Sequence, residues 1–441
     1  MKQLLLLALT AATASPAAAI AYRRHQLANG LVVLLHKNDS APTVAINIWY
    51  KVGSKHESPG RTGFAHLFEH YMFECSKHVP PGGYDAVISK RLGGMNNAFT
   101  AHDKTNYFAV VTKNGLDAVL QLESDRMGFL QDCLNQKSLD QQRGVVQNEK
   151  RQREGEPYSG AEQIVTETFQ APHPYSWNPI GLMKDLEAAT LEDVSQFHKT
   201  FYLPNNAVLA IAGDIDEDQT LERARFWFEG LPGGAAPPQP RFEPLTRLDG
   251  RREKTITDER VRKPMLVMGF PVPGRGQPGS DEAAALASIL AEGRASRLVK
   301  ALRDGSKPIA LDVSAGMVGL NATDLFIIQA IPTEGTSLAD LEIAIHAEIG
   351  KLAKHGPLAG EINRVKAKME TAFTEGLGKI NVVAQNLAEG EAVVHDPNAF
   401  LDGEAGRIGA LNQALLKKAA KRMTPGNVSV IKIIPAPEKK P

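Results

Sequence analysis

The chain carries the same closing pattern twice, and this repeat restricts its fold more than any other feature. Residues 202–206 (YLPNN) and 423–427 (MTPGN) each follow a predicted helix and precede an apolar run that predicts a strand. Pro204 and Pro425 lie 221 positions apart (425 − 204 = 221). Solenoid repeats have much shorter periods, so this spacing indicates duplicated domains.

A segment rich in proline and glycine separates the two copies. Residues 230–240 read GLPGGAAPPQP, a composition that can propagate neither a helix nor a central strand. We therefore predict an N-terminal domain at 22–232, a linker at 233–240 and a C-terminal domain at 241–441. A chain of 441 residues is long enough for each domain to bury its own core.

The predicted elements follow the same order in both copies. In the first copy they are a strand at 44–50, the helix of the motif described below, a strand at 106–112, and helices at 116–129 and 139–153. In the second copy they are a strand at 265–270, a helix at 281–291, a strand at 325–330, and helices at 338–355 and 360–375. This order predicts an α+β fold of two homologous domains, each with a sheet covered by helices on one face.

The N-terminus has the composition of a secretory signal. Lys2 precedes a leucine-rich run at 4–9, and small residues follow up to an A-x-A cleavage pattern that ends near residue 21. We predict a signal peptide at 1–21 and a periplasmic or secreted location in a bacterium, with an uncleaved anchor as the alternative. No later stretch is long and apolar enough to span a bilayer, so we expect no stable membrane insertion after cleavage.

Charge and cysteine content narrow the possible functions. Fifty basic and fifty acidic side chains give no net charge, which argues against a general nucleic-acid binder. The chain has two cysteines, Cys75 and Cys133. They could pair in an oxidising compartment, and two unpaired, partly buried thiols are an equal alternative.

A short motif, His66-Leu67-Phe68-Glu69-His70, supplies candidate metal ligands and a candidate base. On a helix, residues i and i+4 lie one turn apart on the same face, so both imidazoles can reach one metal ion. Glu69, at i+3 from His66, lies beside the same ion. This H-x-x-E-H order is that of the inverted zinc peptidases, in which the glutamate is the base for a zinc-bound water. A polar helix face without a metal is the alternative.

A catalytic zinc ion usually takes three protein ligands and leaves its fourth position to water. The predicted long helix offers Glu149, which lies far beyond His70 in the sequence (149 − 70 = 79). Glu154 and Glu156 are rival candidates, and the sequence alone does not choose among the three.

The second copy lacks the motif. The offset between the two closing patterns places Ala287, Leu290 and Ala291 opposite the two histidines and the glutamate. We therefore expect the second domain to keep the frame of the first without its metal.

Several blocks together resemble the M16 family of peptidases, the group of pitrilysin, insulysin and the mitochondrial processing peptidase. The blocks, in the order of that family, are 53–63, 66–73, 93–107, 143–149, 173–181 and 202–214. The resemblance covers essentially all of the chain after the predicted signal. It implies domains with mostly antiparallel sheets, arranged as half of a clamshell.

The resemblance also implies roles for individual residues. One Zn²⁺ per chain would be held by His66, His70 and Glu149, with Glu69 as general base for peptide-bond hydrolysis. Asn97 and Ala98 would lie on a sheet edge, where a peptide or unfolded segment binds as an added strand. That mode of binding depends on main-chain hydrogen bonds and tolerates many sequences.

The sequence departs from the family pattern at three places. Gln142 stands seven residues before Glu149 (149 − 7 = 142), where the family often has a glutamate. Residues 73–76 read FECS, where the family commonly has FKGT, and a small packed residue is the simplest interpretation of Cys75.

The third departure concerns substrate binding. In the family, an arginine and a tyrosine about seven residues later bind the substrate carbonyl from the C-terminal half. Arg303 matches the arginine, whereas Ala310 or Leu311 occupies the place of the tyrosine. A missing oxyanion donor can cost about a hundredfold or more in rate. We therefore predict the catalytic subunit of a heterodimer whose partner supplies the arginine–tyrosine pair. A catalytic homodimer and a non-catalytic assembly subunit are the alternatives.

Overall fold

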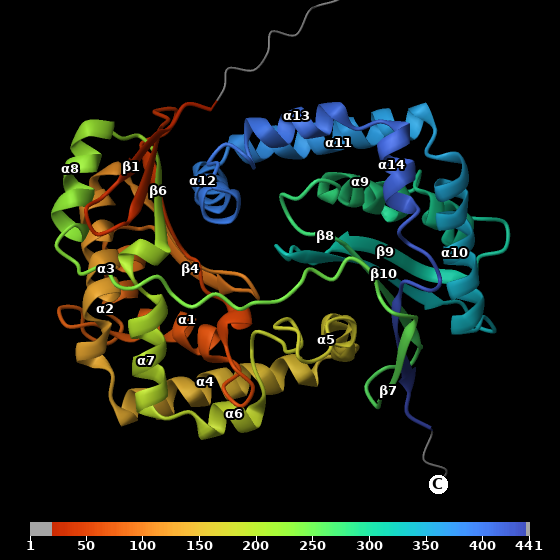
Figure 1. Cartoon of the computed structure of the whole chain (residues 1–441), viewed down its shortest axis with the longest axis horizontal. Coiled ribbons are helices and arrows are strands. Elements are labelled where there is room, and N and C mark those ends of the chain that lie inside the picture. The colour runs from red at the N-terminus through yellow and green to blue at the C-terminus, as the bar shows by residue number, and fades with distance from the viewer. Residues whose placement is uncertain (1–19, 438–441) are drawn as a thin grey trace, which may run out of the picture.

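The computed structural model describes residues 20–437 and contains two sheets flanked by helices (Figure 1). All but the last two residues of the predicted signal peptide therefore lie outside the described residues. No helix within 20–437 combines the length and apolar character needed to cross a membrane. The predicted α+β class with two sheet-containing halves is confirmed.

The first sheet has six strands in the order β1-β2-β6-β3-β5-β4. Its strands are β1 (Arg23–Gln26), β2 (Val32–Lys37), β3 (Thr43–Tyr50), β4 (Met95–Thr100), β5 (Thr105–Thr112) and β6 (Ala207–Gly213). Strands β2 and β6 run parallel, and all other neighbours are antiparallel. Strand β4 forms one edge of the sheet.

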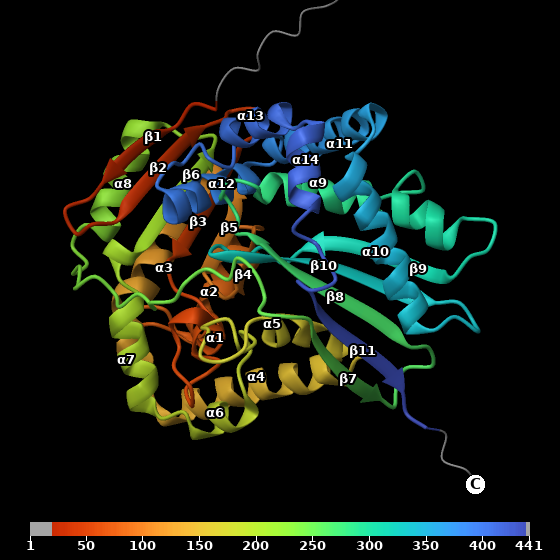
Figure 2. The same cartoon turned by 45° about the vertical axis from the view of Figure 1, so that its right-hand side comes forward.

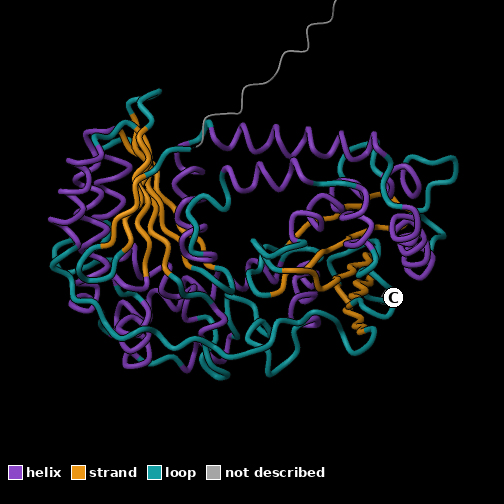
Figure 3. The backbone as a smooth tube through the Cα atoms, turned by 45° about the horizontal axis from the view of Figure 1, so that its top comes forward, coloured by secondary structure: helices purple, strands orange, loops and turns teal. Residues whose placement is uncertain are grey.

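The second sheet repeats this plan with five strands in the order β7-β11-β8-β10-β9. Its strands are β7 (Arg252–Asp258), β8 (Met265–Pro273), β9 (Ala310–Met317), β10 (Thr323–Pro332) and β11 (Ser429–Pro435). Only β7 and β11 pair in parallel. In Figure 3 the two groups of strands stand apart, with helices on both sides and between them.

Fourteen α-helices accompany the strands of the described chain. The helices before the linker are α1 (Phe64–Glu74), α2 (Gly83–Asp85), α3 (Leu116–Phe129), α4 (Gln136–Gly155), α5 (Gln163–Thr168), α6 (Met183–Ala188), α7 (Leu191–Phe201) and α8 (Glu217–Phe228). Those after it are α9 (Ser280–Ala291), α10 (Leu338–His355), α11 (Ala359–Leu377), α12 (Ile380–Val394), α13 (Asp402–Ala410) and α14 (Gln413–Ala420). The segment 229–251 between α8 and β7 has neither helix nor strand. The structure does not test the predicted domain boundaries, which stay predictions.

The duplication extends to a single hydrogen bond before each closing strand. The side chain of Asn206 donates from Nδ2 to the carbonyl of Phe201 at 2.8 Å, and that of Asn427 donates to the carbonyl of Arg422 at 2.8 Å. The two donors, like the two acceptors, are separated by the same offset as Pro204 and Pro425. Both asparagines are buried, and each side chain bonds a carbonyl near the end of the preceding helix. The carbonyl of Arg422 also accepts from the backbone N–H of Thr424 at 3.1 Å.

Each sheet is covered on its second face by a helix from the opposite half. Helices of the first half pack on one face of the first sheet, and α12 lies across the other face, as Figures 1 and 2 show. In the second sheet, α9, α10 and α14 cover one face and α5 the other. Ile164 of α5 packs so closely that a Cβ added at Gly269 would lie 2.8 Å from it. We expected each sheet to be covered by helices on one face. This holds for the helices of its own half, and the second face is covered by a helix of the other half.

The helix α12 is fixed to the first sheet by apolar packing and by ion pairs. Leu387 and neighbouring apolar side chains contact Trp49 and other residues of that face. The carboxylate of Glu389, which is buried, lies 3.0 Å from Lys104 Nζ, and that of Glu391 lies 2.7 Å from Arg24. These contacts join segments that lie far apart in the sequence (389 − 104 = 285).

We predict that Leu387→Ala lowers the free energy of unfolding by about 2–5 kcal/mol, because it opens a cavity between the two halves. Leu387 is 0% exposed. The matched control is Ile343→Ala on α10, where the isoleucine is 68% exposed and the change should stay within about 0.5 kcal/mol. Urea unfolding followed by circular dichroism measures both, and equal effects would contradict the assignment of α12 as a core helix.

Candidate metal centre

The helix α1 carries the motif. Its N-terminus is capped by a carboxylate from several residues earlier in the chain. Its N-cap is Gly63, which adopts a left-handed conformation (φ 90°) and has no side chain to accept the first N–H groups. Glu57 takes this role: its carboxylate accepts from the backbone N–H of Gly63 and of Ala65, both at 2.9 Å. Trp177 Nε1 donates to the same carboxylate at 3.1 Å. Burial raises the pKa of Glu57 to about 8, and these donors oppose that rise.

Three ligand atoms converge between α1 and α4. His66 Nε2 and His70 Nε2 lie 3.5 Å and 3.3 Å from Glu149 Oε2. Ligands about 2.1 Å from a tetrahedral zinc ion lie roughly 3.4 Å from one another. The donor set, two imidazoles and one carboxylate at these separations, therefore fits a zinc ion. Among the described residues, these three are the group whose donor atoms all lie within 4.8 Å of one another.

The protonation of the histidines suits metal binding. Burial, with the neighbouring His70, lowers the pKa of His66 to about 4. Burial also lowers the pKa of His70. Both rings are thus neutral near pH 7 and each keeps a nitrogen lone pair for a metal ion.

Glu69 lies beside these three residues and is not part of the group whose donor atoms converge in the described chain. Its Oε2 atom is buried and has no hydrogen-bond partner among residues 20–437. Burial raises the pKa of Glu69, the charge of Glu149 adds to this, and hydrogen bonding to Thr100 of β4 opposes it. A buried carboxylate oxygen without a hydrogen-bond partner costs free energy unless another group bonds to it. A water molecule between Glu69 and a metal ion would meet that need.

The structure separates Glu149 from its rivals. Arg153 binds the other carboxylate oxygen of Glu149, Oε1, at 2.6 Å, which leaves Oε2 facing the histidines. Glu154 is 61% exposed at its side chain and forms an ion pair with Lys150 at 2.8 Å. Glu156 is exposed beyond the end of α4. Neither Glu154 nor Glu156 belongs to the cluster of donor atoms in the described chain.

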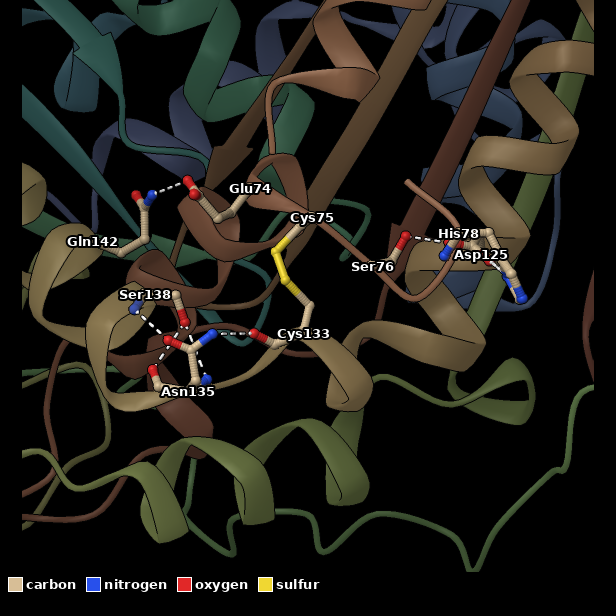
Figure 4. The surroundings of a disulfide bond; sticks show 9 residues. All are labelled: Glu74, Cys75, Ser76, His78, Asp125, Cys133, Asn135, Ser138 and Gln142. Atoms are coloured by element: carbon tan, nitrogen blue, oxygen red, sulfur yellow. Dashed lines mark hydrogen bonds and ion pairs between the residues drawn. A yellow bond between two sulfur atoms is a disulfide. The ribbon is translucent and has the colours of Figure 1, made fainter. Parts of the chain in front are cut away.

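Gln142 and Cys75, at two of the departures from the family pattern, connect the end of α1 with α4 and with the segment that precedes α4. Gln142 donates from Nε2 to Glu74 Oε2 at 2.6 Å. Cys75, directly after α1, forms a disulfide bond with Cys133, with 6.0 Å between the Cα atoms (Figure 4). Of the two states that the sequence left open, the structure has the paired one.

Asn97 and Ala98 lie on β4, and on one side this strand pairs with β5. On its other side the described chain places no strand. The helix α1 packs beside β4, so the free edge of the sheet runs past Glu69. The sequence expectation of an edge position is met, whereas the binding of substrate there stays a prediction.

Arg303 makes its polar contacts within the second half of the chain. It ends the π-helical turn η7 (Val299–Arg303) and pairs with its neighbour Asp304 at 2.9 Å. In the described chain it makes no hydrogen bond or ion pair with a residue of the first half. Ala310 begins β9, one of the two edge strands of the second sheet, and is buried, whereas Leu311 is 44% exposed. A substrate-binding role of Arg303 stays a prediction.

Two family models match the chain. One, described as insulinase (peptidase family M16), covers residues 32–176, and the other, described as the peptidase M16 inactive domain, covers residues 188–369. The chain belongs to the M16 peptidase family. The model of the inactive domain falls largely on the half in which Ala287 and Leu290 of α9 replace the motif and are buried in the second core.

Relatives and solved structures of M16 proteins match over most of the chain. The zinc protease PqqE of Helicobacter pylori is 30% identical over 368 residues, which are 82% of each chain. The crystal structure of a protease from Helicobacter pylori matches with a TM-score of 0.88 at 28% identity, over 94% of this chain and 100% of that one. The periplasmic protease PqqL of Escherichia coli has the same fold, with a TM-score of 0.76 at 20% identity, over 94% of this chain and 47% of PqqL.

Sequence reasoning missed three residues around the site: Glu57, Thr100 and Arg153. Only Glu57 had a signal in the sequence. A helix that begins after glycine needs a cap from elsewhere, and Glu57 is the acidic residue immediately upstream of Gly63. The contacts of Thr100 and Arg153 depend on how β4 and α4 lie against α1.

We predict that Glu149→Gln reduces zinc affinity by on the order of a hundredfold or more, because the neutral amide replaces a charged ligand. The control is Glu154→Gln, later on the same helix (154 − 149 = 5), which should leave affinity unchanged. Competition with a chromophoric chelator measures both variants. Equal zinc affinity in Glu149→Gln and the parent would exclude Glu149 as a ligand.

Proposed function

We propose that the chain is a zinc-dependent endopeptidase that hydrolyses peptides or unfolded segments. The observation that carries this proposal is the convergence of His66, His70 and Glu149 beside a buried carboxylate oxygen of Glu69 without a partner. Membership of the M16 family and the names of relatives such as the zinc protease PqqE support it.

The residues divide the reaction between them. A bound zinc ion would supply a Lewis acid that makes a water molecule far more acidic. Glu69 would take a proton from the attacking water and then deliver it to the leaving nitrogen of the cleaved bond. Its pKa, raised by burial, brings it closer to the working pH than that of an exposed glutamate. His66, His70 and Glu149 would hold the ion and would take no part in moving the proton.

The free edge of β4 would hold the substrate. An extended peptide can add to this edge through alternating N–H and C=O groups, and Asn97 and Ala98 lie within the strand. This geometry accepts an extended segment and excludes a folded domain, whose backbone groups are already paired. It fixes no side-chain preference, because main-chain hydrogen bonds are independent of sequence.

We assign the chain to the catalytic subunit of a heterodimer. The place of the family's tyrosine is held by the buried Ala310 or by Leu311, neither of which can donate a hydrogen bond to an oxyanion. The fold of this chain also occurs as about half of PqqL, of which it covers 47%. A second subunit of similar size would supply the missing donors. An active homodimer and a non-catalytic assembly subunit are the alternatives. We also propose that residues 1–21 act as a signal peptide that directs export of the chain to the periplasm.

We predict that Glu69→Gln lowers hydrolysis of quenched-fluorescent peptides by about 10²–10⁴-fold, because the amide cannot accept the proton. Zinc content should stay at one ion per chain, since Glu69 is not a ligand. The assay uses the chain without its predicted signal, alone and with any co-purifying subunit, and Glu154→Gln is the matched control.

The outcomes separate the alternatives. Activity that needs both Glu69 and the second subunit supports the heterodimer. Full activity of the chain alone, with a dimeric mass in light scattering, would establish the homodimer instead. A zinc-loaded chain that is inactive in both settings would support the assembly subunit.

A further inference from the structure

The helix that supplies Glu149 is weakly anchored by apolar packing. Of the 20 residues of α4, the buried ones are Ser138, Leu139, Gln142 and Val146. Only two of these are apolar, and each stabilises the contact by the amount of one buried aliphatic side chain. The position of α4 on the domain therefore depends to an unusual degree on its polar and covalent contacts, which include a hydrogen bond from Arg143 to the carbonyl of Ala189 at 2.6 Å.

Three connections between α1 and α4 follow one another along their antiparallel contact. The metal ligands form the first connection, and the hydrogen bond from Gln142 to Glu74 forms the second. The disulfide bond between Cys75 and Cys133 forms the third. Gln142 precedes Glu149 by seven residues (149 − 142 = 7), so both lie on one stripe of α4, two turns apart.

The disulfide bond is coupled to the first turn of α4 by hydrogen bonds. Cys133 ends the short helix η4 (Leu130–Cys133), and its carbonyl accepts from Asn135 Nδ2 at 2.9 Å. Asn135 is also the N-cap of α4: its Oδ1 accepts from the backbone N–H of Ser138 at 3.0 Å. Figure 4 shows this chain of contacts from the sulfur atoms to the start of α4.

The other side of the disulfide bond is also held in place. Ser76, which follows Cys75, donates its hydroxyl to the buried Asp125 of α3. The backbone N–H of His78 donates to the same carboxylate at 3.2 Å. The bond thus joins a segment fixed to α3 with the segment that begins α4, and it is not a link between two mobile loops.

From these contacts we infer that the Cys75–Cys133 disulfide is a positioning element of the metal centre. It fixes the register of α4 on α1, so that Glu149 reaches the ion held by His66 and His70. A slip of α4 by one residue would move Glu149 by about 1.5 Å, whereas metal–ligand distances tolerate roughly 0.2 Å. The inference rests on the proposed zinc site and adds that zinc affinity depends on a bond that touches no ligand.

The first test is the zinc affinity of the full chain with both cysteines replaced, Cys75→Ser and Cys133→Ser. Serine is chosen because a free thiol could itself bind zinc. We expect zinc to bind about tenfold more weakly and to leave faster, as is typical for the loss of a group that orients a ligand. Chelator competition gives the affinity, and near-ultraviolet circular dichroism verifies that the variant is folded.

A matched control distinguishes positioning from general stability. Leu352→Ala removes a buried side chain of α10 from the second core and should lower the Tm without changing zinc affinity. Gln142→Ala should weaken zinc binding more in the cysteine-free chain than in the parent, because without the disulfide bond the register depends more strongly on the hydrogen bond from Gln142 to Glu74. Equal effects in both backgrounds would contradict a shared role.

A second measurement covers the case in which the serine variant does not fold. The folded parent is treated with a dithiol, which is oxidised as the disulfide is reduced to two thiols, and the thiols are then alkylated. Zinc should again bind about tenfold more weakly than to the untreated protein. Unchanged affinity, with one zinc in the parent, overturns the inference and leaves the proposed function standing. A parent that binds no zinc overturns both.

Discussion

The need to cover both faces of each sheet determines how the whole chain is arranged. In β3 every residue from Val44 to Tyr50 is buried, with Ile46 and Ile48 in one core and Ala45 and Trp49 in another. A strand of this kind loses stability if either face meets water, because apolar burial on both sides contributes to it. The helices of the first half cover one face only. The second face is covered by α12, which belongs to the other half, and α5 does the same for the second sheet.

This constraint also shows how much of the fold follows from the sequence. Helices at 116–129 and 338–355 were predicted with the bounds of α3 and α10. For α10 the local signals are clear, because Ser337 caps its start and Gly356 follows its last residue. The exchange of α5 and α12 was missed, since a pattern of apolar residues indicates that a face is buried but not by which segment. The apolar run of β8, and that of β3 with the single interruption at Asn47, were the available sign that both faces are covered.

The site divides in the same way between local and distant information. His66, Glu69 and His70 follow from spacing on one helix, which sequence shows directly. That Glu149 rather than Glu154 meets the two histidines depends on the rotation of α4 against α1, two helices that are separated by β4, β5 and α3 along the chain. The cap from Glu57 and the pairing of Cys75 with Cys133 are likewise contacts across space. The second half has a similar arrangement of strands and helices without the motif. Ala287 and Leu290, at the positions that correspond to His66 and Glu69, are buried in its hydrophobic core.

The crossing of α5 and α12 has a consequence for the connection between the halves. The segment 229–251 joins them along the chain, but the contacts that keep them together are apolar layers and the pairs of Glu389 and Glu391 with Lys104 and Arg24. A protease that cut only within 229–251 would therefore leave two fragments that stay associated. Neither fragment would be a self-sufficient folding unit, because each would take with it a helix that the other's sheet requires. The segment 229–251 connects the two halves covalently, and the packing of α5 and α12 on the opposite sheets holds them together.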